Sequence, residues 1–139
     1  MLEGFWFKSE MFAIQAGEDW DTNPGCFGKS LAEWLQTHLE AKGYSPEGII
    51  PEDWGWCLMC SREDFMLWVG CGVMQNELGT IPDPSEITWH CFVVTEVPFW
   101  KFWVKLIKGA EMGAVSSKLH QNLETIFASE PRITMVDEA

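Results

Sequence analysis

The sequence predicts a small α+β domain: an antiparallel sheet of about five strands with two or three helices packed on one face. Residues 51–74 form the longest apolar run rich in strand-forming residues, and turn signals bound it on both sides. Helical stripes precede and follow this run, and the connections are short. With 139 residues, 47% of them hydrophobic and 22% charged, the chain is expected to form one globular core.

In chain order, residues 4–15 are expected to form a first strand that is bent or broken in its middle. Residues 16–25 combine turn formers with three carboxylates and are expected to form an exposed loop. From Ser30 the apolar residues follow the spacing of an amphipathic helix, with Ser30 and Glu33 placed as a capping box and Gly43 as a stop. Residues 44–51 then connect this helix to a central β-hairpin over 54–61 and 65–73.

Beyond the hairpin, residues 75–86 are expected to form a loop and 87–97 a strand with both faces partly covered. Residues 99–108 are apolar except for Lys101, Lys105 and Lys108, which form one narrow basic stripe on a helix, so the other faces are expected to be buried. A helix over 116–128 and a short strand over 132–136 complete the chain. The order β-α-β-β-β-α-α-β favours a ferredoxin-like relative with one added strand.

The composition restricts the class of partner. A net charge of -12 opposes binding to nucleic acid and to anionic lipid, and favours a basic protein face. Nine tryptophans and nine phenylalanines exceed what a small core hides, so some indoles are expected at the surface. No secretory signal and no long apolar window are visible, and the five cysteines are odd in number, so we expect free thiols in the cytoplasm.

The motifs that resemble chemical sites lack the spacing that such sites need. Cys57 and Cys60 form a C-x-x-C pair, but residues three apart on a strand point to opposite faces. Residues 28–30, Gly-Lys-Ser, resemble the end of a phosphate loop, but the glycine required five positions earlier is Asn23. The alternating oxygen donors of 19–23 lack the glycine and glutamate of a calcium loop. We therefore expect no metal, no cofactor and no catalytic residue.

The most informative pattern is a repeated pairing of carboxylates with an indole, because both occurrences precede a core element. The residues are Asp19, Trp20 and Asp21 before the first helix, and Glu52, Asp53 and Trp54 before the hairpin. Aromatic anchors ringed by carboxylates make a binding hot spot for a partner rich in Arg and Lys. In the other interpretation, the indoles pack inward and the acids keep the edge in solution.

Our leading hypothesis is a non-enzymatic, acidic protein-binding module that docks a basic protein. This profile is similar to that of small immunity proteins that neutralise basic bacterial toxins and of phage-encoded inhibitors of nucleic-acid-binding machines, a likeness carried by composition and by no family motif. The alternative is a small-ligand-binding domain or a small hydrolase-like enzyme with a pocket lined by Trp54, Trp56, Trp68 and Trp89. Homo-oligomerisation through surplus aromatic surface is compatible with either function.

Overall fold

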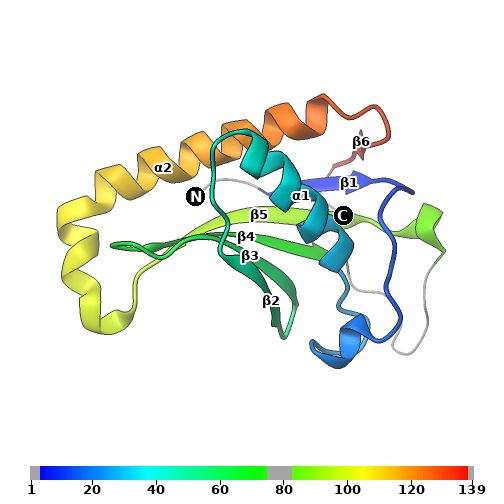
Figure 1. Ribbon diagram of the computed structural model, residues 1–139, viewed down its shortest axis with the longest axis horizontal. Coiled ribbons are helices and arrows are strands. Elements are labelled where there is room, and N and C mark those ends of the chain that lie inside the picture. The colour runs from blue at the N-terminus through cyan, green and yellow to red at the C-terminus, as the bar shows by residue number, and fades with distance from the viewer. Residues whose placement is uncertain (1–3, 75–82, 138–139) are drawn as a thin grey trace.

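The chain folds as a six-stranded antiparallel sheet with two helices packed against one face (Figure 1). The computed structural model describes residues 4–74 and 83–137. The strands are β1 (Phe5–Lys8), β2 (Gly48–Glu52), β3 (Gly55–Ser61), β4 (Met66–Val73), β5 (Trp89–Glu96) and β6 (Thr134–Met135), and the helices are α1 (Lys29–Ala41) and α2 (Phe102–Ala128). The predicted α+β class is confirmed. The predicted loop 75–86 lies outside the described residues up to position 82, and Pro84–Glu86 form a 3-10 turn.

The strand order is β2-β3-β4-β5-β1-β6, so four consecutive strands form a meander and β1 lies between β5 and β6. The predicted hairpin is confirmed as β3 and β4. Strand β2 was predicted to be a connection because of its glycine and proline, but it pairs with β3 along its length. Its edge position explains this, because an edge strand tolerates a proline without losing an inner ladder.

The ferredoxin-like arrangement is kept at one end of the sheet, but the meander is longer than predicted and the two helical crossovers differ in span. The crossover through α1 leads from β1 to β2 and passes three strands of the sheet. The crossover through α2 leads from β5 to β6 and passes only β1, as in a split β-α-β unit. The meander therefore displaces β2 to the far edge of the sheet.

The core lies between the helices and one face of the sheet. Its fully buried side chains include Phe7, Leu58, Val69, Cys71, Trp89 and Cys91 from the strands, Leu31, Leu35 and Leu39 from α1, and Leu119 and Leu123 from α2. Burial of such a side chain stabilises the fold by about 1.5–3 kcal/mol. The apolar stripe predicted for the first helix is therefore confirmed as the core-facing side of α1.

Helix α1 begins at Lys29, but the predicted capping box is absent. The Ser30 hydroxyl donates to a backbone carbonyl of the preceding loop, and Glu33 accepts from a glutamine side chain of that loop. The free amides of the helix start are instead satisfied by Glu18, whose carboxylate accepts from the N–H groups of Gly28 and Lys29, both at 3.1 Å. Glu18 is buried, so the loop 16–25 is not wholly exposed as predicted.

Helix α2 is one helix of 27 residues where two were predicted, because Gly109 and Gly113 do not interrupt it. Its first turns extend past the strands (Figure 1). The expectation that the apolar faces of 99–108 are buried is therefore wrong, since Val104 is the one buried residue of that segment. The exposed apolar side chains there are Phe99, Trp100, Phe102, Trp103, Leu106 and Ile107.

Candidate partner-binding surface

The sheet face opposite the helices carries a row of aromatic side chains, which we call the ring row. It consists of Trp6, Trp54, Trp68, His90 and Phe92. Strand register places these residues on one face, because Trp6 pairs with His90 across β1 and β5, and Phe92 follows His90 by two positions on β5. The ring row is thus the counterpart of the core on the other side of the sheet.

Ring contacts join these five side chains without a gap. Trp54 stacks on Trp68 with ring centroids 5.7 Å apart and an interplanar angle of 18°. Phe92 lies 5.3 Å from Trp54 and 5.0 Å from His90, and Trp6 stacks on His90 at 4.6 Å. Such aromatic pairs contribute about 0.5–1.5 kcal/mol each beyond the area that they bury. The row therefore presents a rigid apolar surface.

Gly70 explains how the rings lie so close to the sheet. It pairs with Phe92 on β5 and with Cys57 on β3. A Cβ atom at Gly70 would lie 2.2 Å from the Phe92 ring, so only glycine allows that ring to rest on the strand. Cys57 is buried on this same side of the sheet, and its burial, followed by the nearby charge of Glu52, raises the pKa of its thiol to about 12.

The two acid–indole segments, residues 19–21 and 52–54, meet at one end of β4. A Cβ atom at Gly28 or at Gly55 would lie 2.3 Å or 2.7 Å from the carbonyl oxygen of Cys71, so the start of α1 and the start of β3 pack on the same peptide group. The side-chain amide of Asn23 donates to the backbone oxygen of Asp53 at 2.9 Å. This packing and this bond hold the two segments side by side, although about thirty residues separate them in the chain.

The predicted partner-binding residues differ in exposure. Trp20 is 89% exposed, and Asp21, Glu52 and Asp53 are exposed as well. Asp19 is half-buried and accepts a hydrogen bond from a loop amide at 3.2 Å, so part of its role is to shape the loop.

Trp54 connects these loops to the ring row. It is 37% exposed and packs against Trp68, whose indole N–H donates to Glu96 at 3.2 Å. Sequence reasoning did not include Trp68, Phe92 or Glu96 in the binding surface. The available signal was the alternation in 87–97, which placed His90 and Phe92 on one face but did not indicate which face the helices cover.

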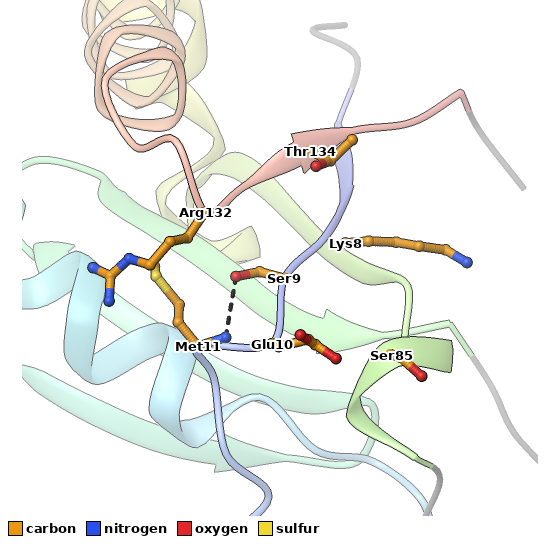
Figure 2. Close-up of a pocket in the computed structure, with 7 residues that line it drawn as sticks. All are labelled: Lys8, Ser9, Glu10, Met11, Ser85, Arg132 and Thr134. Atoms are coloured by element: carbon orange, nitrogen blue, oxygen red, sulfur yellow. Dashed lines mark hydrogen bonds between the residues drawn. The ribbon is translucent and has the colours of Figure 1, made fainter.

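The sheet separates the four tryptophans of the predicted pocket. Trp56 and Trp89 are buried in the core, whereas Trp54 and Trp68 belong to the ring row. A pocket of about 580 Å³ lies elsewhere, beside β1 and β6 (Figure 2). Its lining consists of Lys8, Ser9, Glu10, Met11, Ser85, Arg132 and Thr134.

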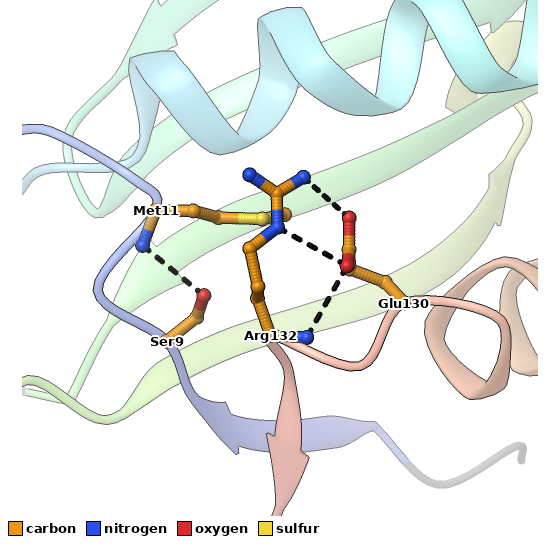
Figure 3. Close-up of polar contacts among 4 residues, drawn as sticks. All are labelled: Ser9, Met11, Glu130 and Arg132. Atoms are coloured by element: carbon orange, nitrogen blue, oxygen red, sulfur yellow. Dashed lines mark hydrogen bonds and ion pairs between the residues drawn. The ribbon is translucent and has the colours of Figure 1, made fainter.

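Two polar side chains of this pocket, Ser9 and Arg132, are engaged with neighbours. Ser9 accepts a hydrogen bond from the backbone N–H of Met11 at 3.3 Å (Figure 2). The Arg132 guanidinium donates to both carboxylate oxygens of Glu130, at 2.6 Å and 3.2 Å (Figure 3). This contact lowers the pKa of Glu130. Lys8 and Arg132 point apart in Figure 2, so their charges do not converge on one ligand position.

The buried cysteines belong to the packing of the sheet. Four of the five free cysteines are buried, and Cys26 is half-buried. In residues 4–74 and 83–137, no three His, Cys, Asp or Glu side chains are arranged to hold a metal ion. Within the same residues, no helix has the length and apolar content needed to cross a membrane.

Comparison with protein-family models, with curated proteins and with solved structures gives no match to this chain.

Proposed function

We propose that this chain is an acidic protein-binding module of the inhibitor kind, similar in role to immunity or phage-encoded proteins, that docks a basic partner on the open face of its sheet. The observation that carries this proposal is the junction of the ring row with the two acid–indole segments at Trp54. Aromatic contact area and carboxylates are adjacent there, and neither helix covers them.

The charges suit a partner rich in Arg and Lys. Asp21, Glu52 and Asp53 are exposed at one end of the row, and Glu96 contacts Trp68. A carboxylate rim attracts a cationic surface and raises the rate of association. Guanidinium and ammonium groups also bind over the faces of indole rings, with a gain of about 0.5–2 kcal/mol per contact.

The rings supply the apolar part of the contact. Hot spots of protein interfaces are enriched in tryptophan and arginine, and they sit in well-packed surroundings. Trp54 and Trp68 are held by each other and by Phe92, so they lose little conformational freedom when a partner covers them. Trp20, which is nearly free of contacts with the body of the protein, is positioned to reach out to a partner.

Affinity capture from native cell extract, followed by binding kinetics with the captured protein, tests the proposal. The wild-type chain should retain a basic protein, and retention should weaken as the salt concentration rises from about 0.05 M to about 0.5 M. Replacing four carboxylates with amides (D19N, D21N, E52Q and D53N) should slow association by about 10-fold and flatten its salt dependence.

A matched control replaces four exposed carboxylates outside this surface, Glu10, Glu40, Glu63 and Glu86, with glutamine. Both variants remove four negative charges, so a difference between them reports position and not net charge. Equal rates for the two variants, or capture of no basic protein by the wild type, would contradict the proposal.

A further inference from the structure

The start of α2 and the 3-10 turn before it, Phe99–Lys101, form an exposed apolar patch outside the ring row that has no role in the proposed function. Phe99 is 84% exposed, Leu106 79% and Ile107 72%. Helical spacing from the buried residues Val104 and Met112 shows that the bulky side chains of 102–107 lie on the side of α2 that faces away from the sheet. Water, and no described part of the chain, covers them.

The same outer face of α2 changes character along its length. Within residues 102–117 of this face, the first half carries Phe102, Trp103, Leu106 and Ile107, and the second half carries Ala110, Gly113, Ala114 and Ser117, all of them exposed. A Cβ atom added at Gly113 would have nothing within 4 Å. Glycine weakens a helix, so its presence here has no explanation within one copy of the chain. It does allow the side chains of a second helix to approach the backbone closely.

We infer that two copies of this chain associate through antiparallel α2 helices, with the bulky residues of 99–107 of each copy packed on the small-residue face of 110–117 of the other. A two-fold interface requires that the surface be complementary to itself. The outer face of α2 meets this requirement only in the antiparallel direction, because a parallel pair would place bulky side chains on bulky side chains.

The exposed area matches a dimer interface. Six exposed apolar residues, two in the turn Phe99–Lys101 before α2 and four in α2 itself, are 51% to 84% exposed, and at about 150–250 Å² for each large side chain they leave about 800 Å² uncovered. One partner of a standard interface buries about 800 Å². A monomer commonly leaves no apolar patch larger than about 300–600 Å².

Lys108 pairs with Asp64 and Glu111 of its own chain, so its charge does not favour one direction of the helix pair. The net charge of -12 opposes association of the two bodies, so added salt should strengthen the dimer.

Sedimentation velocity of the full chain over about 1–100 µM tests this inference, because interfaces of this size bind with micromolar or lower Kd. The wild type should dimerise more tightly at high salt. Ile107→Glu should raise the Kd by at least about 30-fold, as a buried charge at a hot spot does. Gly113→Leu should do the same by filling the small half, and both variants should keep the circular dichroism spectrum of the wild type because both sites are exposed.

Trp20→Ser is the matched control, since it removes an even more exposed indole from another surface and should leave the dimer unchanged. A wild type that stays monomeric over the whole range overturns the inference. A dimer that survives in Gly113→Leu also overturns the inference, because such a dimer does not bury the small-residue face of α2. Binding to phosphatidylcholine or phosphatidylglycerol vesicles by a monomer, lost in Ile107→Glu and kept in Gly113→Leu, would assign the patch to a membrane surface instead. Each of these outcomes is independent of whether a basic partner binds the ring row.

Discussion

The two exposed aromatic surfaces of this protein are built in opposite ways. In the ring row, each ring contacts another ring, and the strand beneath has glycine where Phe92 lies flat. On the outer face of α2, the large side chains of 102–107 project separately into water from a helix that extends past the sheet (Figure 1). The ring row is therefore part of the folded domain even without a partner, whereas the outer face of α2 adds little to the stability of a single copy.

The charges reinforce this difference. Carboxylates adjoin the ring row at Glu52, Asp53 and Glu96, while lysines accompany the exposed half of α2. Residues 97–110 contain no carboxylate, so the exposed end of α2 lacks the acidic rim that the ring row has. A chain with one large aromatic surface of each kind can bind a partner and a second copy at the same time.

Gly70→Val should have the largest effect on stability. A branched side chain at this position would occupy the space of the Phe92 ring, which lies 2.2 Å from the Cβ position. We expect the free energy of unfolding in urea to fall by about 1–3 kcal/mol. The loss of this packing should also expose the Cys57 thiol, whose pKa burial raises to about 12 in the wild type. The thiol of the variant should therefore react faster with a thiol reagent at neutral pH.

The matched substitution on the helix is Gly113→Ala, measured at concentrations below dimerisation. It should raise the free energy of unfolding by up to about 1 kcal/mol, because alanine favours helix and the site is open. A loss of stability in both variants would mean that the two surfaces are built alike.

Trp68→Ala compared with Trp103→Ala should give the next largest difference. Trp68 is held by Trp54, by Phe92 and by a hydrogen bond to Glu96, so its removal should cost about 1–2 kcal/mol in urea unfolding. Trp103 is 51% exposed on α2, and its removal should change the unfolding free energy by less than about 0.5 kcal/mol. Equal losses would show that Trp103 is packed more firmly than its exposure indicates.

Asp64→Asn should have the smallest effect. Asp64, in the turn between β3 and β4, pairs with Lys108 of α2, and the hydrogen bond and charge of that lysine lower the pKa of Asp64 below its ordinary value of 3.8. A lowered pKa in the folded state means that the pair stabilises the protein above the ordinary value, and that this contribution disappears as the pH falls through the lowered pKa.

The wild type should therefore have a slightly higher Tm than Asp64→Asn at pH 7, with the difference vanishing as the pH falls through the lowered pKa of Asp64. The pair is exposed, so salt should reduce the difference further. Faster hydrogen exchange of the amides of 102–108 in the variant would show that this pair restrains the exposed half of α2. A Tm difference that persists at low pH would assign the effect to another interaction of the carboxamide.

Patterns among neighbouring residues predicted the elements that depend mainly on neighbouring residues. The hairpin of β3 and β4, strand β5 and helix α1 follow from alternation and from the helical stripe, and the structure contains all of them. Strand β2 was missed because its proline and glycine indicate a turn, and only its place at the sheet edge makes it a strand. The exposure of 99–107 was missed because an apolar run predicts burial, and the sequence does not say where the sheet ends.

The candidate surface was predictable only where its residues are neighbours in the sequence. Asp19 to Asp21 and Glu52 to Trp54 are two short segments, and both stand out by composition. Their meeting depends on Gly28, which had been considered as part of a phosphate loop. Glu18 looked like one more surface acid, but it is the buried acceptor for the amides at the start of α1.

The position of β1 between β5 and β6 imposes an order on strand pairing in the nascent chain. The first strand leaves the ribosome early, but its partners are synthesised much later, and the last of them pairs Met135 with Phe7. The meander from β2 to β5 forms by contacts between neighbours in the chain, so it can begin to assemble while β1 is still unpaired. Until β5 has emerged, Phe5 and Phe7 remain exposed in the nascent chain, which makes the first strand the segment that a chaperone must shield.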